Sequence, residues 1–357
     1  MKKLKGMSSA TRTNFLTYLG VIVAFVVLQV LSSQGALSNA LKGQLVPVCA
    51  YVVMALSLNL TVGVMGELSL GHAGFMSVGA FSGAVAASAL RDAVSSDLLR
   101  LVIALIIGAV LAGVVGLLIS VPVLRLNGDY LAIVTLAFGQ IIKTLVGNLY
   151  VGMDAKGLHF RFLDPIENLE QGGRMILNGS KGITVTKIST FAVGFVLIMI
   201  TLAVIFNLVN SRAGRAIMAI RDNRIAAESV GLNITKYKMI AFVTSAALAG
   251  AAGALYGLNY GSLMATRFDF NTSILVLVYV VLGGLGNIWG SVIGAAVLYI
   301  LPEALREFSD YRMLVYAIVL ILVMIVTNNP MLKRVFDATL EKLKKKPAPA
   351  GEGGEAR

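Results

Sequence analysis

The sequence predicts an all-α integral membrane protein of about ten transmembrane helices, some of them interrupted at glycines. Three observations support this fold class. Hydrophobic residues make up 57% of the 357 residues and charged residues only 13%, unlike the composition of a soluble protein. The mean hydropathy is +0.84. Long apolar segments alternate with polar ones, and basic residues gather in three of the polar segments.

Each predicted span is an apolar segment that crosses, or nearly crosses, a bilayer core, which takes about 20 helical residues. The segments are Phe15–Leu31, Gln44–Val64, Leu68–Leu90, Leu98–Val123, Tyr130–Tyr150, Thr190–Val209, Met239–Gly261, Thr272–Leu285, Trp289–Leu301 and Met313–Val326. The eighth and ninth segments are short, so the exact span count around residues 272–301 stays open.

The basic residues predict the orientation, because cytoplasmic loops of membrane proteins carry an excess of Lys and Arg. Residues 1–14 are expected to form a basic cytoplasmic N-terminus and residues 15–329 the transmembrane domain. Residues 330–357 are expected to form a basic, largely disordered cytoplasmic tail. Two cytoplasmic termini require an even number of spans. The net charge of +12 therefore reflects topology and does not indicate nucleic-acid binding.

The large extracytoplasmic loop is predicted at residues 151–188. Its acidic and basic residues nearly balance, and it contains glycines and one proline but no long apolar run. We expect short helices or loops packed over the mouth of the protein. A docking site for a soluble extracytoplasmic partner and a plain connection both remain open.

The polar loop at residues 211–238 is rich in Arg and Lys and is predicted to be cytoplasmic. Its middle, Ala216–Val230, has a helical composition, and Gly231 suits a C-terminal cap. A structured helix on this side of a transport-like membrane protein indicates docking of a cytosolic partner.

Two glycine-rich segments, Asn59–Gly74 and Leu282–Gly294, are predicted to be broken helices. Unwound backbone at membrane depth is tolerated where it lines a cavity, and interrupted segments in both halves of a chain point to a transport pathway. Close helix packing through small residues is the competing interpretation. The candidate pathway residues are Asn59, Gly63, Gly66, Gly71, His72, Gly74, Gln140, Gly283, Gly286 and Asn287.

Four polar residues near these segments need separate explanations. A carboxylate is costly in hydrocarbon, so Glu67 is expected at the interface, in the inner turn between two spans. His72 is expected to be a packed, hydrogen-bonded histidine, with a proton relay as the weaker alternative. Asp129 suits a helix N-terminus. Gln140 lies mid-span and needs a partner or a water-lined path.

Sequence signatures of enzymes are missing from the chain. There is no GxxxxGK[ST] phosphate-binding loop, no HExxH and no GxSxG, and the single cysteine, Cys49, lies in an apolar segment. His72 and His159 are the only histidines. We therefore expect neither an enzyme nor a bound cofactor on this chain.

Four ordered motifs carry a family resemblance over most of Leu45–Leu301. They are NLTVGVMGELSLGHAGFMSVGAF (Asn59–Phe81), GDYLAIVTLAFGQII (Gly128–Ile142), GRAIMAIRDNRIAAESVGLN with KMIAFVTSAALAGAAGALY (Gly214–Asn233 and Lys238–Tyr256), and GGLGNIWGSVIGA (Gly283–Ala295). With these motifs the chain resembles the permease subunits of bacterial branched-chain amino acid ABC importers, in particular the larger of their two types. It departs from the family at VGMDAKGL (Val151–Leu158), where members commonly carry Thr-Gly-Gly-x-x-Gly.

The resemblance implies a multi-pass protein of the bacterial inner membrane whose residues 15–329 form a permease domain. It implies a second homologous permease, two cytosolic ATPases that use the ATP, and an extracytoplasmic binding protein that delivers leucine, isoleucine or valine. The cytoplasmic helix is similar to the family's Glu-Ala-Ala coupling element, although Ile225 stands where the acid would be. The coupling residues implied are Arg221, Arg224, Ala226, Ala227, Glu228 and Gly231.

Other functions stay open from the sequence. A permease of the same superfamily for urea, amides or sugars would share this architecture. An ion-coupled secondary transporter would need no ATPase, and a membrane scaffold would leave the broken helices unexplained. The preferred solute, the residues that touch it, and a heterodimeric or homodimeric pore are not decided by the sequence.

Overall fold

The chain is mostly helical, and a computed structural model describes residues 9–35, 38–126, 128–154, 157–166, 173–305 and 311–328. The helices are α1 (Ser9–Ser33), α2 (Asn39–Asn59), α3 (His72–Ala89), α4 (Asp97–Val123), α5 (Asp129–Gly147), α6 (Phe191–Asn210), α7 (Arg212–Asp222), α8 (Arg224–Ser229), α9 (Ile234–Gly257), α10 (Phe270–Gly283), α11 (Ile288–Ala304) and α12 (Arg312–Asn328). They divide into two units, Met1–Glu303 and Ala304–Arg357, and α12 belongs to the second. Residues 1–8 and 329–357, which include most of the predicted basic termini, lie outside the described ranges.

Within the described ranges, six helical stretches are long and apolar enough to cross a membrane. They are Asn39–Val64, Asp97–Val123, Asp129–Gly147, Phe191–Asn210, Ile234–Gly257 and Ala265–Gly283. Each apolar segment predicted from the sequence falls on a helix. Among the described residues, Thr17–Ser33 and Ile288–Ala304 are shorter apolar stretches. The predicted helical membrane fold is therefore confirmed in its class, and a count of about ten spans stays a prediction.

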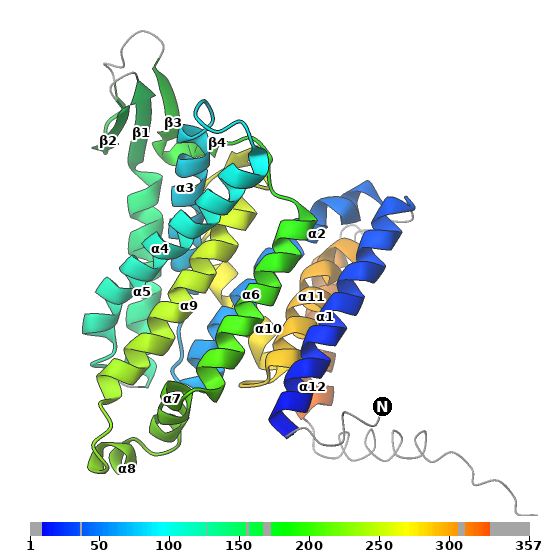
Figure 1. The fold of residues 1–357 in the computed structure, drawn as a ribbon, viewed down its shortest axis with the longest axis vertical. Coiled ribbons are helices and arrows are strands. Elements are labelled where there is room, and N and C mark those ends of the chain that lie inside the picture. The colour runs from blue at the N-terminus through cyan, green and yellow to red at the C-terminus, as the bar shows by residue number, and fades with distance from the viewer. Residues whose placement is uncertain are drawn as a thin grey trace, which may run out of the picture. The chain divides into compact units, whose positions relative to one another are not determined.

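The core of the first unit is built around α2 and α9. Helix α9 packs against α4, α3 and α2, and α4 runs beside it in Figure 1. The apolar window of α2 is 94% buried, whereas that of α4 is only 33% buried. The exposed apolar face of α4 suits contact with lipid, because lipid is as apolar as the side chains themselves.

Helices α3, α4 and α9 approach each other closely at three glycines. A Cβ atom on Gly79 would collide with the backbone of Gly250, and one on Gly108 would lie 2.9 Å from the carbonyl oxygen of Gly79. Small residues let backbones approach in this way. At this crossing, which lies outside both broken helices, the glycines therefore serve close helix packing.

Part of residues 151–188 forms strands, which corrects the prediction of short helices or loops. The strands are β1 (Leu149–Asp154), β2 (Gly157–Phe162), β3 (Arg174–Asn178), β4 (Ile183–Thr184) and β5 (Ser262–Leu263). They form one antiparallel sheet in the order β2-β1-β3-β4-β5. The missed signal is the alternation of apolar and polar residues in Leu158–Phe162, and β5 comes from the distant segment after α9.

The predicted helix over Ala216–Val230 is two helices, α7 and α8. The chain turns at Asn223, whose extended backbone ends α7 and whose Oδ1 accepts a hydrogen bond from the Ala226 N–H at 3.0 Å. Asn is a preferred N-cap residue, so this interruption was readable from the sequence. Gly231 has a φ of +83° and ends α8, as predicted for a C-terminal cap.

Both predicted helix interruptions are confirmed. Helix α2 continues into a π-helical turn, Leu60–Val64, and the chain then runs without helical structure until α3 begins at His72. Within this connection Gly66 has a φ of +78°, a conformation that favours glycine. Helix α10 ends at Gly283, and α11 begins at Ile288. Asp129 is the first residue of α5, as predicted.

We predict that Gly79→Ala destabilises the fold, because the added methyl group collides with the backbone of α9. Overpacking of this kind costs about 1–3 kcal/mol. The matched control is Gly43→Ala in α2, where nothing lies within 4 Å of the new Cβ. Unfolding of the purified variants in detergent, followed by circular dichroism against denaturant, measures the difference. Equal midpoints for the two variants would contradict the glycine crossing.

Candidate functional site

The two helix interruptions meet at Asn59. Its Oδ1 accepts a hydrogen bond from the N–H of Gly286 at 2.8 Å, and its side chain is buried. Gly63 lies against Gly286 so closely that a Cβ atom would collide with the Gly286 nitrogen. The structure therefore brings together three of the pathway residues predicted from opposite halves of the chain.

Arg221 of α7 connects the cytoplasmic loop to the first interruption. Its Nη1 donates a hydrogen bond to the carbonyl oxygen of Gly63 at 3.0 Å, and its aliphatic stem lies against Gly66. The guanidinium group also pairs with Asp222 at 2.9 Å. The last carbonyls of a helix have no partner within the helix, so Arg221 satisfies a group that the broken helix leaves unpaired.

A buried ion pair ties the same connection to α9. The Nζ of Lys238 donates to the Oε1 of Glu67, and the two side chains are only 6% and 12% exposed. Glu67 was expected at an interface without a specified partner, and Lys238 was counted only as a charge of the basic loop. The pairing was not predictable because the two residues are far apart in the sequence.

A chain of hydroxyl groups crosses the core beside this ion pair. The Thr61 hydroxyl donates to the Ser245 oxygen at 2.8 Å, and Ser245 donates to the backbone oxygen of Ser57. The Ser57 hydroxyl is hydrogen-bonded to the Nε2 of His72 at 2.8 Å. His72 is 2% exposed, so its surroundings are those of a packed, hydrogen-bonded histidine.

The start of α3 packs against α5 and α10. Gly71 lies against the carbonyl of Thr135, and the Thr135 hydroxyl accepts a hydrogen bond from the Leu70 N–H at 3.1 Å. The Ser273 hydroxyl accepts one from the Ala73 N–H at 3.1 Å. These contacts hold the first turn of α3 in a fixed place between two neighbouring helices.

Gln140 and Gly74 line, with Asp269 and Ser273, a narrow crevice that has no room for a water molecule. The α-carbon of Gly139 lies 3.0 Å from a Cβ built on Gly74. Gln140 is half-buried, so the structure gives this mid-span amide a polar neighbourhood. These pathway candidates form a second group, separate from the one around Asn59.

The remaining candidates, Gly283 and Asn287, shape the turn between α10 and α11. A Cβ on Gly283 would collide with the backbone of Gly290, so these two helices pack closely there. The Oδ1 of Asn287 accepts a hydrogen bond from the Gly290 N–H at 3.2 Å. Asn287 is exposed and acts as a local cap.

Three buried polar groups near the first interruption have no hydrogen-bond partner within the described ranges. They are the Nδ2 of Asn59 and the hydroxyls of Ser69 and Ser77. Buried polar groups are normally paired with protein or ordered water. These three groups are exceptions to that rule.

Helix α8 exposes an apolar surface. Ile225 is 81% exposed and Val230 76% exposed. Ala227 is buried on the opposite side of α8, where it packs with Ile220 and Ile234. Of the implied coupling residues, Arg224, Ala226, Glu228 and Gly231 are exposed as well. The sequence analysis missed Ile225 and Val230 as contact residues, because an amphipathic pattern predicts that apolar side chains are buried.

In the part of the chain that the structure describes, no group of three His, Cys, Asp or Glu side chains could hold a metal ion. Figure 1 shows α7 and α8 at one end of the helices of the first unit and β1, β2 and β3 at the other. The candidate site is a set of contacts between helix ends.

A family described as "Branched-chain amino acid transport system / permease component" matches residues 40–325. The high-affinity branched-chain amino acid transport system permease protein LivM of Salmonella typhimurium is 34% identical over 286 residues, 77% of this chain and 66% of the relative. LivM of Escherichia coli K12 matches to the same extent. The chain thus spans slightly less than two thirds of these relatives.

A more distant relative covers more of both chains. The ribose import permease protein RbsC of Escherichia coli K12 is 26% identical over 320 residues, which are 87% of this chain and 92% of the relative. No solved structure matches the chain.

We predict that Lys238→Met strongly destabilises the protein, because it leaves the buried carboxylate of Glu67 unpaired. Removing one partner of a buried pair costs about 3–5 kcal/mol. The double variant Glu67→Gln/Lys238→Met is expected to recover most of this loss. The control is Asp92→Asn, which breaks an exposed pair with Arg174 and should change the free energy of unfolding by less than about 1 kcal/mol. A double variant no more stable than Lys238→Met would refute the buried pairing.

Proposed function

The chain belongs to the family of permease components of branched-chain amino acid transport systems, and on this premise we propose that it is a permease subunit of an ATP-driven importer. The cargo we propose is leucine, isoleucine or valine. The identity to two permeases named for branched-chain amino acid transport supports this cargo. The carrying observation is the contact of Arg221 with Gly63, which joins the cytoplasmic loop to a broken helix.

We propose that the chain crosses the bacterial inner membrane about ten times, with both termini in the cytoplasm. The basic loop at residues 211–238 supports this orientation. The polar turn between α10 and α11 would then face the cytoplasm with α7, and the sheet would face outward.

The proposed assembly contains a second homologous permease, two cytosolic ATPases and an extracytoplasmic binding protein. Residues 211–238 would form the coupling loop, and α8 would dock on an ATPase. Its exposed Ile225 and Val230 offer the apolar contact, while Arg224 and Glu228 offer charged ones. Ala227 would hold α8 against the loop from inside. ATP would be used by the partner subunits.

The mechanism we propose is mechanical and involves no covalent chemistry on this chain. Closure of the ATPases would move α7 and α8, and Arg221 would transmit the movement to Gly63. From there the contact of Asn59 with Gly286 would carry it to the second interruption. Backbone that is already unwound can change its φ and ψ angles at low cost, so these connections suit hinges.

The translocation path we propose runs past the unpaired groups of Asn59, Ser69 and Ser77 and the crevice of Gln140 and Gly74. These groups can exchange hydrogen bonds with a passing zwitterion. Sugar transport is the second candidate, since the ribose permease relative aligns over more of both chains. Solute uptake with the binding protein that co-purifies with the chain distinguishes the two.

We predict that Arg221→Ala uncouples transport from ATP hydrolysis. In proteoliposomes that contain the co-purified ATPases and binding protein, uptake of leucine should fall about tenfold or more, while ATP hydrolysis continues. The reason is the loss of a charge-assisted hydrogen bond worth about 1.5–3 kcal/mol. Arg215→Ala, on the same helix, is the control and should transport normally. Unchanged leucine uptake by Arg221→Ala would remove this residue from the coupling route.

A second prediction concerns docking. Ile225→Asp and Val230→Asp should reduce recovery of the ATPases when the tagged chain is purified from membranes in mild detergent, because each puts a charge into an apolar contact. Leu163→Asp is the control, since Leu163 is 74% exposed but lies beside β2, on the sheet side. Mass spectrometry of the co-purified proteins gives the readout. ATPases recovered equally with all three variants would contradict docking through α8.

A further inference from the structure

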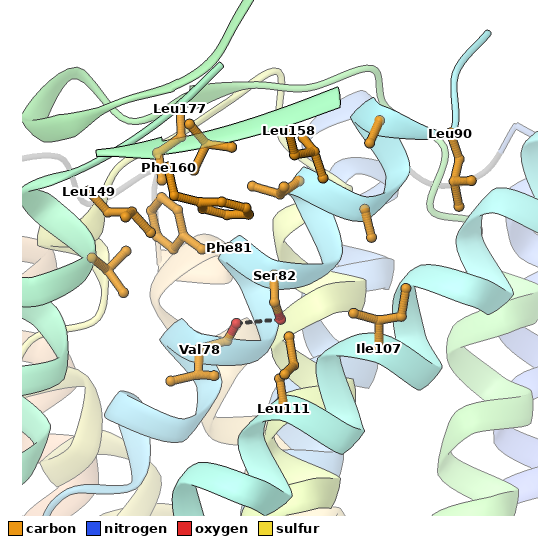
Figure 2. A pocket seen from close by; sticks show the side chains of 15 residues that line it. Val78, Phe81, Ser82, Leu90, Ile107, Leu111, Leu149, Leu158, Phe160 and Leu177 are labelled. Carbon is orange, nitrogen blue, oxygen red and sulfur yellow. Dashed lines mark hydrogen bonds between the residues drawn. The ribbon is translucent and has the colours of Figure 1, made fainter. Parts of the chain in front are cut away.

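An apolar cavity of about 540 Å³ lies at the sheet end of the helices. Figure 2 shows its boundary: α3 with Val78 and Phe81 behind, α4 with Leu111 on one side, and β2 with Phe160 above. It is separate from the crevice of Gln140 and from the contacts of Asn59. Its volume lies in the range of about 300–1,000 Å³ that holds small organic ligands.

The lining of this cavity offers no free polar group. Its one hydroxyl, on Ser82, already donates to the carbonyl oxygens of Val78 at 2.6 Å and Gly79 at 3.3 Å. A polar group buried without a hydrogen bond costs several kcal/mol, roughly 2–7. A zwitterionic amino acid would lose such bonds at both ends, and water would find no partners. The occupant must therefore be hydrocarbon.

The cavity opens onto the part of α4 that suits lipid contact. Leu111, in its wall, is 43% exposed, and its neighbours Ile106 and Val110 are 58% and 57% exposed. The lining is thus continuous with an exposed apolar face on one of the six candidate spans. A hydrocarbon chain can enter from the bilayer without passing through water.

The shape of the cavity also fits a chain. Its floor follows one stripe of α3 from Val78 to Leu90, which is about 18 Å at 1.5 Å per residue. Half of a hydrocarbon core of about 30 Å is about 15 Å. The length of the cavity is therefore close to the hydrocarbon depth of one bilayer leaflet, which is the length that an acyl chain spans.

Two arginines lie at the end of α3, beyond the apolar residues that line the cavity. Arg91 and Arg174 line a small polar cavity of about 80 Å³ beside Ser88, next to the cavity residues Ala89 and Leu90. Arg174 is held by the Ser88 carbonyl at 2.8 Å and by Asp92, and Arg91 is exposed. Guanidinium groups are the protein donors best matched to phosphate.

We propose that this cavity is a lipid site that holds one acyl chain of a membrane phospholipid, with the lipid phosphate at Arg91 and Arg174. The bound acyl chain would fill the space between α3, α4 and the sheet, and so support the sheet from the membrane side. This inference depends on membrane insertion of α3–α5 and not on which solute the protein transports.

The test is photocrosslinking with a phospholipid that carries a diazirine on its acyl chain. The full chain, with any partners that co-purify, is placed in nanodiscs of that lipid, irradiated and digested, and adducts are mapped by mass spectrometry. Expected are adducts on Phe81 and Val85, because Phe81 is only 4% exposed and is reached only through the cavity. Adducts confined to outward residues such as Val110 would overturn the proposal.

Two variants sharpen this test. Ala86→Phe fills the cavity, with Ala89→Leu as a milder alternative, and either should reduce adducts at Phe81 about tenfold, the effect of excluding roughly two methylene groups. Val114→Phe, on the exposed face of α4, is the matched control and should leave them unchanged. Arg91→Gln should lower the yield by severalfold, since a phosphate contact is lost. Equal yields in filled and control variants, or crosslinks of the cavity to a second protein, would refute a lipid occupant.

Discussion

The connection between α2 and α3 constrains the rest of the structure, because it interrupts a helix and leaves backbone groups that other elements must pair. Three backbone groups of this connection and of the first turn of α3 are paired by three different elements: Gly63 by Arg221 of α7, Leu70 by Thr135 of α5, and Ala73 by Ser273 of α10. Irregular backbone at membrane depth persists only with such partners. The interruption therefore fixes where its neighbours lie.

The same requirement explains why the interruption can serve as a junction. A continuous helix would satisfy its own backbone and would need nothing from α7 or from the turn before α11. Because this one is broken, Arg221 and Asn59 hold backbone groups that belong to other elements. The buried Glu67–Lys238 pair adds a third tie, to α9. A displacement of any of these elements would change the hydrogen bonds that tie the others to the connection. In this way the position of α7 is coupled to the positions of α9 and of the turn before α11.

Local patterns in the sequence predicted the helices, both interruptions and the cap at Gly231, since each depends on residues close together in the chain. The sheet was missed because its strands are short and β5 joins from beyond α9. The Lys238–Glu67 pair was missed for a similar reason, as charge alone does not name a partner. The break at Asn223 could have been found, because Asn with a following helix is a capping signal. The contacts that the sequence did not predict are mainly those between residues far apart in the chain.

The two ends of the first unit differ in chemistry, and the difference follows from what each end must hold. At the α7 end, close contacts at glycines and hydrogen bonds from Arg221 and Asn59 to backbone groups are directional and specific. At the sheet end, the cavity is lined by apolar side chains, so contacts with an occupant there are dispersive. Dispersive contacts tolerate small shifts at little cost, whereas each hydrogen bond has a preferred geometry. An acyl chain in that cavity would let α3 and α4 shift against the sheet while all three remain packed. The dispersive contacts at the sheet end would then allow small shifts that the hydrogen bonds at the α7 end do not allow.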